Sequence, residues 1–196
     1  MVATPATARG IATRQRIVDA ATAEFAQYGI AGARVERIVT AARTNKAQLY
    51  SYFGDKDALF DAIFRASLER IMNVVPIDAD DLADWAVRLY DEYLRRPDLI
   101  RLATWSRLER RPTGHLVEDA NRLDTGKLAQ IVDAQHRGLV RDADPFDLMA
   151  MVISMSMTWS PVSNVYSASD DEPDDAHDPR RAFLRESVAR VCAPDR

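Results

Sequence analysis

Residues 46–53, Lys-Ala-Gln-Leu-Tyr-Ser-Tyr-Phe, combine polar and apolar side chains in a pattern that suits contact with DNA. On a helix, Leu49 and Phe53 lie one turn apart and point to the same side, toward a core. That leaves Lys46 and Gln48 for the outer side, where lysine can bind guanine acceptors and glutamine can pair with adenine. The two tyrosine hydroxyls of the segment suit phosphate oxygens.

Further polar residues around this segment complete the predicted DNA-contacting set. Lys56 follows the start of the next predicted helix, where a lysine and free backbone amide groups together hold a phosphate. Thr44 and Asn45 precede the segment, and either side chain can cap it. For each residue the alternative is an ordinary solvated or half-buried packing role. The full predicted set is Arg34, Arg43, Thr44, Asn45, Lys46, Gln48, Tyr50, Tyr52 and Lys56.

Other kinds of chemistry have little support in the sequence. His115, His136 and His177 are too far apart for a local metal-binding pair. A single cysteine, Cys192, excludes an internal disulfide framework and a multi-cysteine metal site. We find no nucleophile–base pattern and no phosphate-cradling glycine loop. The sequence therefore predicts neither an enzyme nor a bound metal or other cofactor.

Two short amphipathic helices joined by a tight turn must position the DNA-contacting side chains. The spacing of apolar residues predicts a first helix over 13–28 with Gly29 at its end, a short helix over 35–42 and a second short helix over 46–52. Such a pair is typical of a helix-turn-helix, whose second helix enters the major groove. Asp55 is placed to cap a fourth helix.

Helical periodicity continues through the rest of the chain, and no stretch shows sustained strand alternation. The sequence therefore predicts an all-α protein of about nine helices. Pro145 suits the first turn of one of them, and the last is expected over 180–192. The acidic stretch 166–179 contains two prolines and is expected to be a solvated loop.

Charge is unevenly distributed along the 196 residues. The net charge of −4 argues against a protein that coats nucleic acid through bulk charge. Residues 1–46 carry seven basic and three acidic residues, a net +4, whereas the other 150 carry 19 basic and 27 acidic residues, a net −8. This indicates that only the N-terminal part meets a polyanion, although chance also produces an imbalance of this size. Neither a secretory signal nor a membrane span is apparent, so we expect a cytoplasmic protein.

The run from Thr13 to Leu59 resembles the N-terminal domain of the TetR/AcrR family of transcriptional regulators. The matching residues are Arg16 to Ala21, Phe25-Ala26, Tyr28-Gly29, then Val35, Ile38, Ala42, Leu49-Tyr50-Ser51-Tyr52-Phe53 and Lys56-Asp57-Ala58-Leu59. The Leu-Tyr-x-Tyr-Phe-x-x-Lys-x-x-Leu run is a fairly specific signature. The remaining chain is similar to the family only in length and helical layout.

The resemblance implies a helix-turn-helix DNA-binding domain over 1–57 and a ligand-binding and dimerisation domain over 58–196. Family members hold an effector within the second domain and pair their last two long helices with those of a second copy. For a mostly apolar effector, with plain core packing as the alternative, the expected pocket residues are Tyr90, Tyr93, Arg101, Trp105, His136, Met151, Met155 and Trp159. The expected dimer-interface residues are Met149, Val152, Ser156 and Val188.

The chain departs from the family pattern in the turn of the helix-turn-helix. Arg43 replaces the usual glycine, which costs about 1 kcal/mol if that position needs a positive φ. Asn45 replaces the usual serine cap, and Ala47 replaces a common glycine. The expected function is a repressor that binds a palindromic double-stranded DNA operator as a homodimer and is released by a small effector. The alternative, supported only by Arg43, is a ligand-binding helical adaptor whose degenerate helix-turn-helix does not bind DNA.

Overall fold

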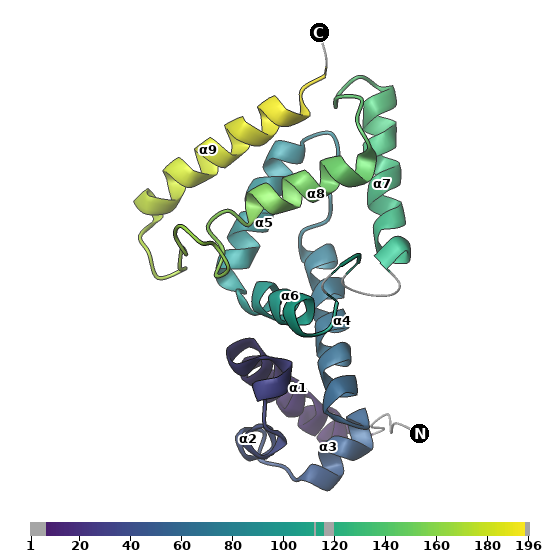
Figure 1. Cartoon of the computed structure of the whole chain (residues 1–196), viewed down its shortest axis with the longest axis vertical. Helices are drawn as coiled ribbons and strands as arrows, with labels where there is room; N and C mark the ends of the chain where they lie inside the picture. The colour runs from purple at the N-terminus through teal and green to yellow at the C-terminus, as the bar shows by residue number, and fades with distance from the viewer. Residues whose placement is uncertain (1–6, 112, 116–119, 195–196) are drawn as a thin grey trace. The chain divides into compact units, whose positions relative to one another are not determined.

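The computed structural model describes residues 7–111, 113–115 and 120–194, with the backbone alone over 120–124. Within these residues it contains nine helices and no strand, which confirms the predicted all-α class (Figure 1). The helices are α1 (Ala8–Gly32), α2 (Val35–Ala41), α3 (Lys46–Phe53), α4 (Lys56–Val74), α5 (Leu82–Arg95), α6 (Asp98–Glu109), α7 (Ala120–His136), α8 (Pro145–Ser156) and α9 (Asp174–Cys192).

The chain forms two compact units. Unit 1 contains Met1–Glu69 and Asp98–Leu116, and unit 2 contains Arg70–Pro97 and Val117–Arg196. Unit 1 therefore includes α1 to α3, most of α4 and also α6, because α6 packs along α1. The predicted domain boundary after residue 57 falls within the first turn of α4, and the prediction had placed α6 in the second domain.

Aromatic and aliphatic side chains at helical spacing form the core of unit 1. Ile17, Ala21 and Phe25 follow one another at i, i+4 along α1 and are fully buried. The Phe25 ring meets the Phe60 ring of α4 edge to face, with centroids 5.3 Å apart. Burial of a large side chain such as Ile17 or Phe25 stabilises the fold by about 1.5–3 kcal/mol. This core holds α1 against α4, and α2 and α3 pack against α1.

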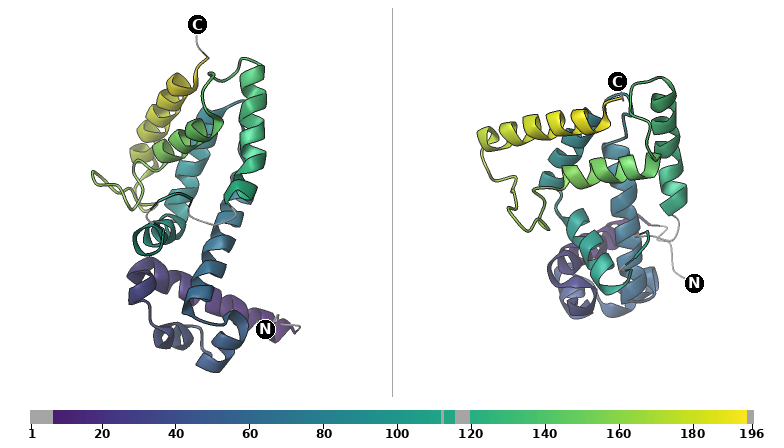
Figure 2. Two further views of the ribbon diagram at one scale, coloured as in Figure 1. Left: turned by 45° about the vertical axis from the view of Figure 1, so that its right-hand side comes forward. Right: turned by 45° about the horizontal axis from the view of Figure 1, so that its top comes forward.

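Unit 2 is built around α5, which packs against α8 and α9, while α7 packs against α8 (Figure 2). Trp85, Leu89 and Tyr90 of α5 are buried, which explains the apolar stripe in the sequence of this helix. The Trp85 indole N–H donates to the Val75 carbonyl oxygen at 3.3 Å. Unit 2 thus has a core of its own.

Local capping signals are confirmed by the structure. The Asn45 side chain accepts the Gln48 amide at 2.9 Å, and Asp55 Oδ1 accepts the Ala58 amide at 2.7 Å. Pro145 begins α8 as predicted. These signals are reliable because each depends on a few neighbouring residues only.

Two predicted helix boundaries are wrong. Helix α1 begins at Ala8, well before residue 13, because the Thr7 hydroxyl accepts the Gly10 amide at 3.1 Å and caps it. Helix α9 begins at Asp174, inside the stretch expected to be a loop. Asp174 and Asp175 occupy its first turn, where negative charge is favourable near the helix N-terminus.

Candidate nucleic-acid interface

A tight turn joins α2 to α3. Arg43 has φ of 51°, and it is the one non-glycine residue with a positive φ in the described part of the chain. The turn is closed by Arg43 N–H donating to the Thr40 carbonyl at 3.1 Å and Thr44 N–H donating to the Val39 carbonyl at 3.0 Å. The helix-turn-helix therefore forms with Arg43 in the left-handed region. The residue that supported the adaptor alternative does not break the motif.

Helix α3 buries one side and exposes the other. Leu49 is fully buried and Phe53 is 4% exposed, as their spacing predicts. Lys46 lies in the first turn with half of its side chain exposed, and Tyr50 is 42% exposed. The outer side therefore offers an ammonium group and a phenol hydroxyl to a ligand. The predicted contacts Arg34, Arg43 and Asn45 are also exposed.

Lys46 is paired with a carboxylate from the preceding helix. Its Nζ donates to Glu36 Oε1 of α2, and both side chains are more than half exposed. The hydrogen bond raises the pKa of Lys46 and lowers the pKa of Glu36, so both groups are charged at neutral pH. Sequence inspection did not single out Glu36, which places a negative charge beside a predicted DNA contact.

Gln48 is held between two hydroxyl groups on the same face of α3. Thr44 Oγ1 donates to Gln48 Oε1 at 2.7 Å, and Gln48 Nε2 donates to Tyr52 Oη at 3.3 Å. All three side chains are half-buried. Three residues of the predicted set are thus joined in one hydrogen-bonded row.

A buried carboxylate fixes the start of α2 to α1. Glu24 is only 8% exposed, and its Oε1 accepts the Arg34 amide at 2.8 Å and Arg37 Nε at 2.7 Å. The Arg37 guanidinium also lies over the Tyr28 ring, 4.2 Å from its centroid. Glu24 and Arg37 were not predicted as site residues. The available signal was a glutamate on the apolar stripe of the first helix, where a carboxylate requires a buried partner.

Two basic residues of the motif bind backbone carbonyl groups. Arg16 Nε donates to the Ala42 carbonyl at 3.0 Å, which ties α1 to the turn. Lys56 Nζ donates to the carbonyls of Ala33 at 3.3 Å and Ala31 at 3.4 Å, at the end of α1. Lys56 thus has an anchoring role that the predicted phosphate contact did not include. An ammonium group has three donors, so one remains for a phosphate.

Helix α6 holds the end of α1 through one glutamate and one tryptophan. Helix α1 is interrupted at Gly29, which has φ of 73° and ψ of −176°. Glu109 Oε1 accepts the Ile30 amide at 3.1 Å, and Glu109 Oε2 accepts the Ala31 amide at 2.7 Å. The Trp105 ring lies directly against Gly29. We refer to Trp105 and Glu109 on Gly29 as the α6 clamp.

Two protein-family models match this chain. The family model described as bacterial regulatory proteins, tetR family, matches residues 17–63, which include α2 and α3. A second model, tetracyclin repressor-like, C-terminal domain, matches residues 81–190, more than half of the chain. The chain belongs to the TetR family. Members of this family are DNA-binding transcriptional regulators rather than enzymes, and this chain is such a regulator.

Individual TetR-family proteins are similar over most of their length. The HTH-type transcriptional repressor SCO4008 of Streptomyces coelicolor is 40% identical over 154 residues, 77% of this chain and 79% of the relative. The HTH-type transcriptional repressor NicS of Pseudomonas putida is 29% identical over 141 residues, 66% of each chain. The putative transcriptional regulator SCO4942 from Streptomyces coelicolor is 37% identical in sequence to this chain. Its crystal structure matches this structure with a TM-score of 0.75, over 92% of this chain and 98% of the other.

The predicted effector-binding residues are divided between the two units: Arg101 and Trp105 lie in unit 1, and the other six lie in unit 2. Arg101 is exposed on α6, and the Trp105 indole N–H donates to the Ala26 carbonyl at 3.2 Å, so Trp105 serves packing within unit 1. In unit 2, His136 is exposed and Met151 is 52% exposed. None of these four residues is buried, because helical periodicity alone does not tell which neighbour an amphipathic face meets.

The remaining predicted pocket residues lie in or near the core of unit 2. Tyr90 is 2% exposed, its hydroxyl is hydrogen-bonded to His177 Nδ1 at 2.7 Å, and its ring meets Trp159 edge to face at 5.7 Å. Tyr93 is buried, and this burial raises its pKa to about 12. Met155 is half-buried. Tyr90 and Trp159 are therefore neighbours, as an effector site needs.

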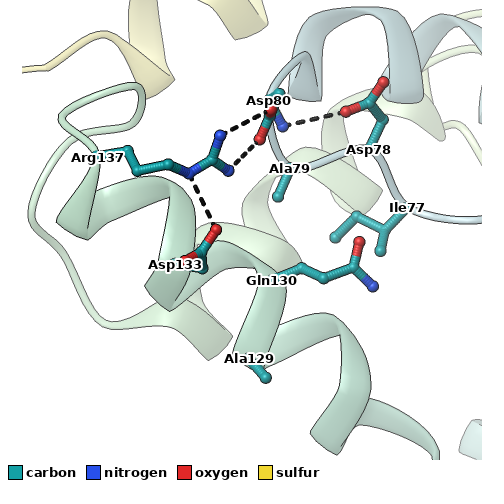
Figure 3. Close-up of a pocket in the computed structure, with 8 residues that line it drawn as sticks. All are labelled: Ile77, Asp78, Ala79, Asp80, Ala129, Gln130, Asp133 and Arg137. Carbon is teal, nitrogen blue, oxygen red and sulfur yellow. Dashed lines mark hydrogen bonds and ion pairs between the residues drawn. The ribbon is translucent and has the colours of Figure 1, made fainter.

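A groove of about 480 Å³ lies elsewhere in unit 2, between the α4–α5 connection and α7 (Figure 3). Arg137 crosses it and binds Asp80 at 2.9 Å and Asp133 at 2.9 Å. The Arg137 hydrogen bond lowers the pKa of Asp80. None of the predicted pocket residues lines this groove. The lining residues are Ile77, Asp78, Ala79, Asp80, Ala129, Gln130, Asp133 and Arg137.

The residues predicted for the dimer interface are buried within the chain itself. Met149 is 3% exposed, Ser156 is 1% exposed, and Val152 and Val188 are fully buried. They face the core of unit 2, so these four side chains are covered by their own chain rather than exposed as the prediction required. The outer sides carry Met151 at 52% and Phe183 at 64% exposure instead.

The described ranges contain neither a metal-binding cluster nor a membrane-spanning helix. No group of three or more His, Cys, Asp or Glu side chains is arranged to hold a metal ion there. Among the described helices, none combines the length and apolar character needed to cross a membrane.

Proposed function

We propose that this TetR-family protein is an effector-responsive repressor that binds a palindromic operator as a homodimer. The observation that carries the proposal is the geometry of α3. It is capped by Asn45, follows a closed turn, and directs Lys46 and Tyr50 outward while Leu49 and Phe53 face the core. A helix with one buried apolar side and one exposed polar side is suited to enter the major groove.

A homodimer follows from the size of the recognition element. A helix of eight residues reads only a few base pairs, and a two-fold dimer reads two half-sites. The exposed apolar residues Met151 of α8 and Phe183 of α9 provide contacts for a second copy. Repression is supported by the similarity to SCO4008, which is named a transcriptional repressor.

The effector site proposed for unit 2 centres on Tyr90 and Trp159. His177 is hydrogen-bonded to Tyr90 through Nδ1, and Ser160 directly follows Trp159 in the chain. His177 Nε2 and Ser160 Oγ are buried and have no hydrogen-bond partner among the described protein atoms. A small ligand with an apolar body and one polar group would satisfy such atoms. The effector releases DNA if it binds more tightly to the conformation that cannot bind DNA than to the conformation that can. Its affinity for the DNA-bound protein is then lower than its affinity for the free protein, by the same factor by which it lowers the affinity for the operator.

Selection from a pool of random duplex DNA tests the DNA-binding function. The purified full chain is mixed with the pool at low salt, the retained fraction is sequenced, and the mass of the complex is measured under native conditions. We expect a palindromic motif bound by two copies. Absence of enrichment from folded protein overturns the proposal.

Two charge variants on the selected operator test whether α3 makes the contact. Lys46→Gln should weaken binding and reduce the slope of log affinity against log salt by about one. Glu36→Gln should strengthen binding, because it removes the carboxylate that competes with phosphate for Lys46. Arg96→Gln removes an exposed positive charge outside unit 1 and serves as the control, with no change expected. Equal effects of all three variants contradict the assignment of α3.

The homodimer has its own test. Phe183→Glu should shift the native mass toward the monomer, since it places a charge in the proposed contact. Val165→Glu alters another strongly exposed apolar residue and should leave the dimer intact. A Phe183→Glu protein that remains dimeric excludes this side of α9 from the interface.

A further inference from the structure

The hydrogen-bonded row consists of Thr44 in the turn before α3, and Gln48 and Tyr52 on α3 itself. Thr44 Oγ1 donates to Gln48 Oε1 at 2.7 Å, and Gln48 Nε2 donates to Tyr52 Oη at 3.3 Å. Gln48 and Tyr52 are spaced i, i+4 and share one face of α3, whereas Thr44 lies in the turn just before the Asn45 cap, so Gln48 is held from both sides. Both contacts lie within the protein itself.

Counting donors and acceptors shows what the Gln48 amide has left to offer. The carbonyl oxygen has two lone pairs, and the amide nitrogen has two N–H groups. The row uses one lone pair, which accepts from Thr44, and one N–H, which donates to Tyr52. One acceptor lone pair and one N–H therefore remain on the amide. A glutamine amide binds adenine N6 and N7 in the major groove through one acceptor and one donor.

We propose that Thr44 and Tyr52 are positioning residues that hold the Gln48 amide ready to read an adenine in each half-site of the operator. This role presupposes the DNA binding proposed above and adds a base preference to it. An unrestrained glutamine loses rotamer freedom when it binds a base, and immobilising such a side chain weakens binding by about 2- to 10-fold. A glutamine already held by two hydroxyl groups avoids most of that loss.

Tyr52 links the row to the DNA backbone as well. Its hydroxyl oxygen accepts from Gln48, so its own proton remains available for a phosphate oxygen. The preference for adenine is therefore expected to depend on both Thr44 and Tyr52. A change at Tyr52 would also affect the phosphate contact, whereas a change at Thr44 would affect the base contact only. This difference makes Thr44 the better residue to change first.

The experiment compares wild-type protein, Thr44→Val, Thr44→Ser and Gln48→Ala on the selected operator and on operators changed at each A·T pair. Thr44→Val removes the donor with little change in shape, and Thr44→Ser keeps the hydroxyl. We expect Thr44→Val to lose about 3- to 10-fold of the preference for adenine at one position per half-site. Thr44→Ser should retain it, and the salt slope should be the same in all these proteins because no charge changes.

A double variant isolates the coupling. In a Gln48→Ala background, Thr44→Val should have no further effect on base preference, because the group that Thr44 positions is absent. Thermal unfolding of each variant confirms that the fold is retained.

The possible outcomes separate this role from the DNA-binding function itself. If wild-type protein selects an operator but Thr44→Val keeps the full preference, the positioning role is refuted and the function stands. If Thr44→Val weakens all sequences equally, Thr44 contacts the DNA backbone and the positioning role is again refuted. If wild-type protein selects no DNA, the proposed function itself fails.

Discussion

Replacing Gly29 by alanine should strongly destabilise unit 1. Gly29 has φ of 73° and ψ of −176°, a backbone conformation that is nearly confined to glycine. A Cβ added there would lie 2.8 and 2.9 Å from two atoms of the Trp105 ring and would also overlap a carboxylate oxygen of Glu109. The substitution therefore strains the backbone and forces the α6 clamp apart.

The two costs can be given separate magnitudes. Holding alanine in this backbone region costs about 1–3 kcal/mol. Overpacking against a close-packed aromatic ring costs a further amount of about 1–3 kcal/mol. Opening the clamp would also free the Ile30 and Ala31 amides from Glu109. We therefore expect Gly29→Ala to lower the free energy of unfolding by roughly 3 kcal/mol or more, a large part of a typical total of 5–15 kcal/mol.

Gly32→Ala is the matched control on the same helix. Gly32 is exposed, and its added Cβ would meet only Tyr28 Cβ at 3.4 Å, an ordinary contact. This variant should be neutral or more stable by about 0.4–1 kcal/mol, because alanine restricts the unfolded chain. Urea unfolding followed by circular dichroism measures both variants. Similar midpoints for Gly29→Ala and wild type would refute the account of the clamp.

Three other substitutions test separate features. Arg43→Gly should stabilise the protein by about 1 kcal/mol in urea unfolding, because φ of 51° suits glycine. Tyr90→Phe should destabilise it by about 1–3 kcal/mol in the same assay, because buried His177 loses its partner. Glu172→Gln should lower the unfolding temperature at neutral pH, because the Ser169 amide holds the pKa of Glu172 at about 2, below its usual 4.5. That stabilisation is present above pH 4.5 and disappears as the pH falls toward 2, so the difference from wild type should shrink over that range.

Each of these substitutions has a control. Arg43→Ala keeps a Cβ in the left-handed region and should bring no gain, so an equal gain would show that charge rather than backbone strain is responsible. Tyr90→Phe combined with His177→Leu removes both partners and should cost less than the sum of the single changes. Asp171→Asn changes a neighbouring acidic residue in the loop of Glu172. A pH-independent difference between Glu172→Gln and wild type would contradict the stated cause.

The helix-turn-helix was predictable because its signals are local. Asn45 and Asp55 are caps that act within three residues, and the i, i+4 pair Leu49 and Phe53 identifies the buried side of α3. The caps and the i, i+4 pair need only the residue types of one short segment. A positive φ at Arg43 was raised only as a condition, from the family's usual glycine in the turn, and the structure has φ of 51° there.

Contacts between distant segments were not predictable in the same way. Glu109 binds amide groups almost 80 residues earlier in the chain, and its sequence neighbours give no indication of that partner. The exposure expected for the dimer-interface residues was wrong for a related reason. Apolar stripes on α8 and α9 show that these helices are amphipathic, but the stripe with Val152 and Val188 turned out to cover the chain's own core. Choosing between core and interface requires the packing of α5.

Cleavage of DNA from a reagent tethered to α3 tests the central claim most directly. Ala47 is exposed on α3, and Ala47→Cys introduces a reactive thiol there. The native Cys192 is 7% exposed, and burial raises its pKa to about 11, so it should react little and the wild-type protein serves as the control. With a hydroxyl-radical-generating reagent on position 47, we expect two clusters of cuts in the selected operator, about 10 base pairs or a multiple of that apart. Uniform or absent cleavage by a labelled protein that still binds the operator would show that α3 does not enter the major groove.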